Sequence, residues 1–461
     1  ALIAAVAGRS LEDPDLRISL FAVGDDDQNI YAFSGASVEF IRRFQNDYKA
    51  RPFYLTENFR STANIIEAAN RVIAPARNRM KAEHPITIDR ARRAAPKGGA
   101  LARLDPVAQG RVQILQTSNN AADQAMAAIG ELERLSALVP GWSWGRVAVI
   151  AREWRYLHPV RSRCEHLGIP AHMANERGPG LWRMREMQQI LRLLRVDPLR
   201  LVDLDRMQDF IRAQPANVWW QQISDGLARM QATLGGQPAP AAEIVEWLAE
   251  WSSGQRTAPT GLQLLSAHRA KGLEFDHVIL LDGAWQKRAP EEDPDAARRL
   301  YYVAMTRARQ SLTLVQTGAG HPFLTEDDCR ALSGRSPSID PRDRATCTRL
   351  YDPPDPGMVD LSHAGRLRAE HPALAAINKA STGDPLTIEK QGNRWWIRNS
   401  DGIPIGRMAK KFEPPQGYRI DEARIGGVMV WRKLDNDEQY HASIRRDEWE
   451  TVLPDISYTP R

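Results

Sequence analysis

Short apolar segments that alternate with helical patterns are the feature that most restricts the fold of this chain. The first of them, Ile18 to Val23, leads directly into Gly24-Asp25-Asp26-Asp27-Gln28. Alternation of this kind predicts a parallel β-sheet covered by helices, and α/β proteins place their chemistry where such strands end. The segments with strand character are residues 18–23, 53–55, 112–116, 147–151, 262–266, 278–282 and 312–316.

Helical patterns fill the intervals between these segments. A helix is expected after Gly35, with Ser37 as its N-cap, and another begins near Ser61. Residues 121–135 have a helical pattern, and Asp293-Pro294 predicts the start of a helix that runs to about Arg309. These helices are the expected cover of the sheet.

Two later regions depart from the alternation. Between Gly178 and Pro259 amphipathic helices replace the strands, at residues 184–196 and 241–251 for example, which predicts a helical insertion. A proline-rich stretch from Ser336 to Gly357 has the composition of a linker. Beyond it, alternating segments predict a small antiparallel β unit. Its tryptophans are expected to belong to the core of that unit, namely Trp395, Trp396 and Trp431.

Composition limits the class of protein. With 461 residues the chain should form two to four domains, and 43% hydrophobic with 26% charged residues is typical of a globular protein. No apolar run is long enough to span a bilayer, so we expect a cytoplasmic protein without a membrane partner. The three cysteines lack any Cys-x-x-Cys spacing, which predicts buried or idle thiols. The chain opens on Ala1 in what resembles the middle of a helix, so we expect a piece of a longer protein.

Four segments carry recognisable motifs in a fixed order. They are Val23-Gly24-Asp25-Asp26-Asp27-Gln28-Asn29-Ile30-Tyr31, Asn58-Phe59-Arg60-Ser61, His268-Arg269-Ala270-Lys271-Gly272-Leu273-Glu274-Phe275 and Tyr302-Val303-Ala304-Met305-Thr306-Arg307-Ala308. They resemble the third to sixth motifs of the UvrD, Rep and PcrA helicases, which are superfamily 1 DNA helicases. The resemblance covers residues 18–316. It implies RecA-like parallel-sheet domains of the P-loop NTPase type, of which the first is partial.

The resemblance also implies roles in ATP hydrolysis. Gln28, Arg60 and Arg307 would be catalytic, because phosphoryl transfer needs a group that orients water and guanidinium groups on the phosphate oxygens. The ATP-binding set would comprise Gln28, Phe59, Arg60, Gly272, Glu274 and Arg307. Within it, Phe59 would pack on adenine and Glu274 would hold the ribose. Ordinary core packing remains the alternative for Phe59, and a solvated surface position is the alternative for each arginine.

DNA contacts follow from the same resemblance. Tyr31 and Phe33 match aromatic positions that stack on single-stranded bases, while His268 and Lys271 match positions that line the DNA groove. Ser34 stands where the family usually has arginine, so the coupling between DNA and nucleotide is in doubt. The expected partners are single-stranded DNA, duplex/single-strand junctions and ATP. A protein partner could bind through the C-terminal unit.

Two motifs of the family are absent from these residues. No Gly-x-x-x-x-Gly-Lys-Ser/Thr loop and no Asp-Glu-x-x-Asp element occur, so the ligands of Mg²⁺ are expected outside this chain. We interpret Asp25, Asp26 and Asp27 as residues that shape their loop, and no metal site is expected here. The chain alone should therefore not hydrolyse ATP.

The complete interpretation is part of an ATP-dependent 3′→5′ DNA helicase or translocase that acts in DNA repair or recombination. The alternative is a non-catalytic DNA-binding or assembly module derived from a helicase. The expected domains are a remnant of the first RecA-like domain (1–74), the second RecA-like domain (75–177 and 259–325), the helical insertion (178–258), a linker (326–360) and a mainly-β domain (361–461).

Overall fold

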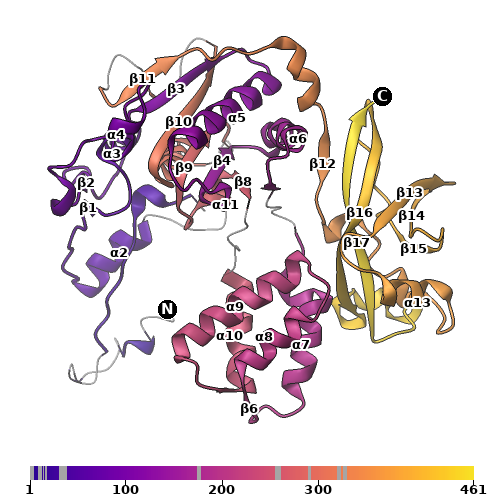
Figure 1. The fold of residues 1–461 in the computed structure, drawn as a ribbon. Helices are drawn as coiled ribbons and strands as arrows, with labels where there is room; N and C mark the ends of the chain where they lie inside the picture. The colour runs from indigo at the N-terminus through magenta and orange to yellow at the C-terminus, as the bar shows by residue number, and fades with distance from the viewer. Residues whose placement is uncertain are drawn as a thin grey trace. The chain divides into compact units, whose positions relative to one another are not determined.

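The structure is a computed structural model, and it forms two compact units. It describes residues 5–8, 13, 15, 18–30, 39–173, 178–254, 261–288, 292–318, 323–324 and 330–461. Unit 1 consists of residues 1–116 with 270–335, and unit 2 of residues 117–269 with 336–461. The ribbon is drawn in Figure 1.

Unit 1 is built on neighbouring strands in the order β11-β3-β10-β9. β11 runs parallel to β3 and β10 runs parallel to β9, as the alternation of strands and helices predicts. The strands are β3 (Val112–Thr117), β9 (Phe275–Leu280), β10 (Ala308–Thr317) and β11 (Leu332–Arg335), with a short parallel pair β1 (Glu57–Asn58) and β2 (Thr87–Ile88). The helices of unit 1 are α2 (Glu39–Tyr48), α3 (Ala63–Ile73), α4 (Leu101–Leu104) and α12 (Ala296–Met305).

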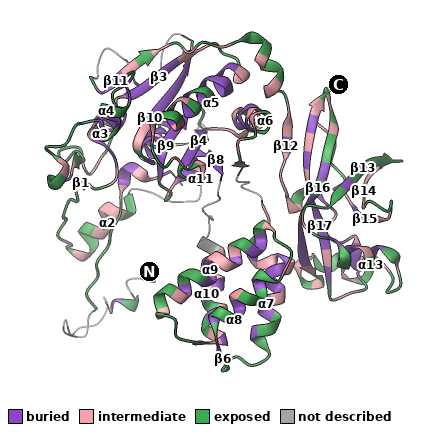
Figure 2. Ribbon diagram, in the orientation of Figure 1, coloured by how far each residue is buried: buried purple, intermediate pink, exposed green. Residues whose placement is uncertain are grey.

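The expected strands at 18–23 and 53–55 do not form. Both segments are irregular and largely exposed: the exposed fraction is 90% for Phe21 and 78% for Leu55 (Figure 2). A strand needs a neighbour for its backbone groups and covering layers for its faces, and no described strand pairs with these segments. The helix expected to end near Arg309 instead ends at Met305, because residues from Ala308 onward join the sheet as β10.

Unit 2 contains a second run of parallel strands, in the order β4-β8-β5. β4 (Val147–Ala151) and β8 (Leu262–Ser266) are buried along their whole length and have the bounds that the sequence predicts. β5 covers Ala171–Met173. The helices of this region are α5 (Ala121–Leu138), α6 (Leu157–Leu167) and α11 (Ala267–Ala270).

The predicted helical insertion is present in unit 2. Its helices are α7 (Arg185–Arg195), α8 (Leu204–Arg212), α9 (Val218–Leu234) and α10 (Ala241–Gly254), with a short antiparallel pair β6 (Leu201–Val202) and β7 (Ala239–Pro240). Asn217 caps α9 by accepting hydrogen bonds from the backbone N–H groups of Trp219 and Trp220. Asp203 caps α8 in the same way, by accepting the backbone N–H of Asp205, so these two helices have partners for some of the N–H groups at their starts.

The C-terminal region forms the predicted antiparallel sheet, with strands in the order β12-β17-β16-β13-β14-β15. The strands are β12 (Leu350–Asp352), β13 (Pro385–Gln391), β14 (Arg394–Arg398), β15 (Pro404–Arg407), β16 (Tyr418–Arg432) and β17 (Glu448–Pro460), and α13 spans Pro372–Lys379. β16 and β17 form a long ladder that pairs Tyr418 with Pro460 at one end and Arg432 with Glu448 at the other. β12 lies within the residues expected to form a linker.

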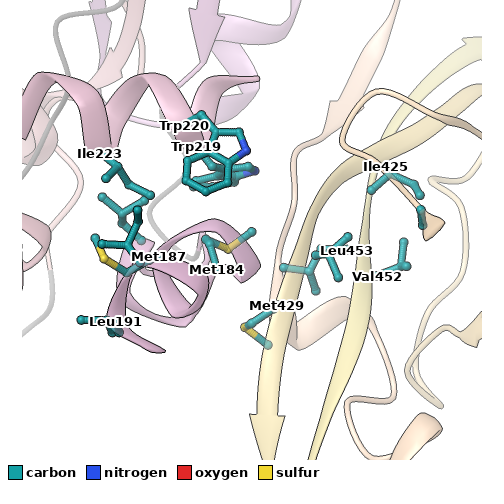
Figure 3. Close-up of a cluster of buried hydrophobic side chains, with 14 of the residues drawn as sticks. Met184, Met187, Leu191, Trp219, Trp220, Ile223, Ile425, Met429, Val452 and Leu453 are labelled. Carbon is teal, nitrogen blue, oxygen red and sulfur yellow. The ribbon is translucent and has the colours of Figure 1, made fainter. Parts of the chain in front are cut away.

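One hydrophobic core joins the helical insertion to the C-terminal sheet within unit 2 (Figure 3). Met184 forms a β-bridge with Met429, and Trp219 donates its indole N–H to the carbonyl of Gly426 at 3.0 Å. A Cβ added at Gly427 would lie 2.4 Å from Met184 Cε and 2.8 Å from Trp219 Nε1, so only glycine fits there without rearrangement. The insertion is thus packed directly on β16.

Two of the three cysteines agree with the expectation of buried thiols. Cys164 and Cys347 are buried free thiols, and burial raises the pKa of Cys164 to about 12, which leaves little reactive thiolate. Cys329 lies outside the described residues. Among the helices that the structure describes, none has the length and apolar character needed to cross a membrane.

Candidate nucleotide site

The third motif, residues 23–31, contains a tight loop at Asp25 to Gln28 that is held by cations from a later segment. Asp27 makes a bidentate ion pair with Arg79, with both N···O distances at 2.8 Å, and is 1% exposed. Lys81 Nζ lies 2.6 Å from Asp25 Oδ1, and Asp26 accepts the backbone N–H of Met80. The hydrogen bonds that Arg79 donates to Asp27 raise the pKa of Arg79.

The three carboxylates of this loop lie close enough together to suggest a metal site. Each of them already has a cation or a backbone N–H as partner, and Asp25 also accepts the side chain of Gln28 at 2.7 Å. A divalent cation would have to displace Arg79 and Lys81. The set therefore does not fit Mg²⁺, and its contacts hold the loop that carries Gln28.

Lys271 connects the third and fifth motifs. Its ammonium group donates a hydrogen bond to the backbone carbonyl of Gln28 at 2.9 Å. Burial, with a contribution from the nearby charge of Arg307, lowers the pKa of Lys271. Gly272 follows at a φ of +84°, a conformation that favours glycine, and a Cβ there would meet open space. The reason for glycine is thus the backbone turn.

The fourth motif presents Arg60 from a turn stabilised by Asn58. The Asn58 side-chain oxygen accepts the backbone N–H groups of Arg60 and Ser61 at 2.9 and 2.8 Å. Arg92 donates to the carbonyls of Asn58 and Ser61, which fixes the same turn from outside. Phe59, which lies between Asn58 and Arg60 in this turn, is 74% exposed. Its core-packing alternative is therefore wrong, and its ring is free to stack.

Arg60 is paired with Glu274 across more than two hundred residues of sequence. Its guanidinium forms an ion pair with the Glu274 carboxylate, and that hydrogen bond lowers the pKa of Glu274. A second Arg60 nitrogen donates to the carbonyl of Thr306 at 3.3 Å, while the Arg60 Nε atom is buried without a hydrogen-bond partner. The fourth, fifth and sixth motifs thus meet at this pair.

Arg307 is buried, with only 2% of its surface exposed. Its guanidinium donates to the carbonyls of Val303 and Leu273 and to the Thr306 hydroxyl, at 2.9, 3.4 and 3.0 Å. Burial and the charge of Arg60 lower its pKa to about 10. No carboxylate among the described residues forms an ion pair with it, so an anion placed here would restore the lost solvation.

The structure brings most of the predicted nucleotide residues together in unit 1, and it leaves part of the predicted DNA set undescribed. Gln28, Arg60, Glu274 and Arg307 are linked through the contacts above, together with Lys271, which the resemblance predicts to line the DNA groove. His268 is half-buried in α11. Tyr31, Phe33 and Ser34 lie outside the described residues, as do Ser37 and the start of its helix before Glu39.

Sequence reasoning missed the residues that support this site. Arg79, Lys81 and Arg92 hold the loops that carry Gln28 and Arg60, yet their surroundings in the sequence have no motif character. Asn58 could have been found, since an Asn that precedes a turn is a common acceptor for the N–H groups that follow it.

Two segments of the chain that contribute residues to this site match family models of helicase domains. Residues 2–49 match the UvrD/REP helicase N-terminal domain, and residues 247–318 match the UvrD-like helicase C-terminal domain. Both matches are to UvrD-like helicase domains, and the parallel α/β fold agrees with them.

Individual relatives narrow the class. ATP-dependent DNA helicase UvrD2 of Mycobacterium tuberculosis is 28% identical over 327 residues, which are 65% of this chain and 43% of that protein. DNA helicase II of Haemophilus influenzae is 24% identical, over 80% of this chain and 60% of that protein. The putative ATP-dependent DNA helicase YjcD of Bacillus subtilis is 50% identical over 62 residues, or 13% of this chain and 8% of that protein. Over these segments the chain is similar to UvrD/Rep-like superfamily 1 helicases.

The chain spans about half the length of the two longer matches, 43% and 60% of those proteins. A solved C-terminal domain of a possible DNA helicase from Lactobacillus plantarum covers 60% of this chain at 15% identity, with a TM-score of 0.25.

Proposed function

We propose that this chain is part of an ATP-dependent DNA helicase, in which Arg60 and Arg307 bind the γ-phosphate and Gln28 orients the attacking water. The observation that carries the proposal is the buried Arg307, which has no carboxylate partner among the described residues and whose pKa is lowered to about 10 beside Arg60. Two guanidinium groups near one another in a partly buried site are stabilised by a multiply charged anion. A nucleoside triphosphate such as ATP is an anion of this kind.

Residues of this chain would divide the work between the nucleotide and DNA. Phe59 would stack on the adenine with its exposed ring, and Glu274 would hold the ribose once ATP has drawn Arg60 toward the phosphate. Lys271 touches the carbonyl of Gln28, so a DNA phosphate that attracts Lys271 would alter the loop that orients water. This single contact would couple the DNA groove to hydrolysis. Movement along single-stranded DNA with 3′→5′ polarity and a role in repair are part of the proposal.

Magnesium would enter with the nucleotide and neutralise the phosphate charge during transfer. None of the described carboxylate clusters fits the ion, and the phosphate-binding loop motif is absent from this sequence. The chain would therefore supply the guanidinium side of the phosphate site only. A non-catalytic DNA-binding module is the competing function, and it has no need of a γ-phosphate clamp.

Titration with a fluorescent ATP analogue tests the nucleotide site. Arg307→Gln should weaken ATP binding by roughly tenfold to a hundredfold, since a hydrogen bond to a charged group contributes about 1.5–3 kcal/mol. Arg71→Gln is the matched control, because Arg71 is exposed on α3 in the same unit. Equal affinity for wild type and Arg307→Gln would contradict the proposal and favour the non-catalytic module.

A further inference from the structure

Three arginines line one hollow on the C-terminal part of unit 2. The hollow has a volume of about 440 Å³ and lies between the segment before α13 and the segment before β17. Arg368 comes from the first segment, and Arg445 and Arg446 come from the second. Glu370 is the one acidic residue among its lining residues, so the lining carries a net positive charge.

Neighbouring arginines differ from these three in having carboxylate partners. Arg366 pairs with Asp360, and Arg432 pairs with Glu448. Arg368, Arg445 and Arg446 form no ion pair with any residue that the structure describes. The Nε atom of Arg446 is in addition buried without a hydrogen-bond partner. A buried donor without an acceptor is costly, and an anionic ligand in the hollow would supply the acceptor.

The backbone around the hollow is fixed by contacts of its own. The N–H group of Arg445 donates to the carbonyl of Gly365 at 2.8 Å, which ties the two segments together. Gly365 packs on the Trp449 ring so closely that a Cβ would lie 2.8 Å from it. Trp449 is 4% exposed and donates its indole N–H to the carbonyl of Leu361 at 2.7 Å. The arginines are therefore held on a rigid frame before any ligand binds.

A second, smaller hollow continues the surface. It has a volume of about 220 Å³, and Arg446 lines it as well as the first. Arg192 also lines it, but Arg192 is paired with Glu448. Glu448 and Glu450 line this second hollow too, so the net positive charge is confined to the larger hollow.

We propose that this arginine hollow binds the phosphate backbone of duplex DNA. Guanidinium groups suit phosphate because they offer several donors in a fixed plane. Proteins that hold single strands use exposed aromatic rings as stacking platforms, and the apolar lining here consists of Leu367 and Ala369. Contact with phosphates alone favours a duplex, whose charges are closely spaced along both strands. The identity of the polyanion as DNA rests on the proposed function.

The hollow would hold the duplex by contacts without sequence preference. Such contacts position a protein on DNA, whereas contacts with base edges specify sequence. A duplex site on the C-terminal part of the chain would keep the substrate bound while a single strand engages the helicase motifs. The expected signature is a strong dependence of duplex affinity on salt concentration.

Fluorescence anisotropy tests the site. A labelled blunt duplex of about 20 base pairs is titrated with the whole chain at several salt concentrations. Arg368→Gln/Arg445→Gln/Arg446→Gln should lower duplex affinity at least about tenfold. The slope of log affinity against log salt should fall by about two to three, or roughly 0.9 for each lost phosphate contact. Arg368→Gln/Arg445→Gln changes only exposed residues, so it should show about two thirds of that slope change even if Arg446 affects folding.

Arg419→Gln is the matched control. Arg419 is exposed near the start of β16, where it faces Thr459, whereas the hollow lies near the other end of the ladder, before Glu448. The separation is roughly 40 Å for about twelve residues of strand. This variant should bind the duplex as wild type does.

Three results would overturn the inference. They are an unchanged salt slope in the triple variant, an equal loss in Arg419→Gln, and a wild-type chain that binds a glutamate-rich peptide in the hollow but no duplex. The third result would make the hollow a site for an acidic protein partner. The proposed function fails by a separate result. Normal single-strand binding by Lys271→Ala would contradict the proposed contact between Lys271 and DNA, and duplex binding at the hollow would be unaffected.

Discussion

Replacing Arg185 by alanine should destabilise unit 2 strongly. Arg185 makes a bidentate ion pair with Glu450 on β17, with N···O distances of 2.8 and 2.7 Å, and the two side chains are only 13% and 19% exposed. It also donates to the carbonyls of Ala380 and Ile377. Alanine would leave the carboxylate and both carbonyls without these partners. Removing one member of a pair that is largely buried costs about 3–5 kcal/mol.

The assay is urea unfolding followed by tryptophan fluorescence and circular dichroism. Arg206→Ala is the matched control, because Arg206 on α8 is 89% exposed and its ion pair with Asp203 is 4.0 Å long, which predicts a change below about 1 kcal/mol. Since α7 and the C-terminal sheet share one core, the loss should appear equally in signals from helix and strand. A change below about 1 kcal/mol for Arg185→Ala, or separate transitions for helix and strand, would refute this reasoning.

Three further results are expected. Arg60→Lys should weaken ATP binding nearly as much as Arg60→Ala, because a point charge does not replace a planar fork, and near-normal binding by the lysine variant would exclude Arg60 from the phosphate site. Burial, with a contribution from the charge of Arg161, lowers the pKa of His158 to about 4. The neutral ring of the folded state therefore contributes fully to the free energy of unfolding above about pH 6.5, and this contribution, at most about 3 kcal/mol, should be lost as the pH falls toward 4. Denaturant titrations across that pH range check this, and His158→Gln should flatten the dependence of the unfolding free energy on pH. The chain alone should show no DNA-stimulated ATP hydrolysis, and turnover that Arg307→Ala abolishes would contradict that.

Sequence patterns predicted the strands that are buried along their whole length. The strands at 147–151 and 262–266 have the expected bounds because both are fully buried, and a continuous apolar run reports that burial directly. The strand expected at 18–23 fails for the complementary reason: the pattern records a preference, but pairing requires a neighbouring strand. The helical insertion and the antiparallel sheet were both predicted, although their common core was not.

The candidate site divides in the same way. The resemblance to helicase motifs indicated Gln28, Arg60, Glu274 and Arg307, and the fold brings these residues together. The ion pair that Arg79 makes with Asp27 joins residues with unrelated local sequence, so no pattern could have predicted it. Long-range partners of this kind are set by the packing of elements, which a single sequence does not display.

The ratio of ATP to ADP affinity tests the central claim most directly. A clamp on the γ-phosphate contributes to ATP binding and has nothing to hold in ADP, so wild type should prefer ATP by about tenfold or more, from contacts of about 1.5–3 kcal/mol each. Isothermal titration of both nucleotides against wild type, Arg307→Gln and the exposed Arg71→Gln gives the ratio without requiring hydrolysis. The account predicts that the preference persists in Arg71→Gln and disappears in Arg307→Gln. An undiminished preference in Arg307→Gln would contradict it.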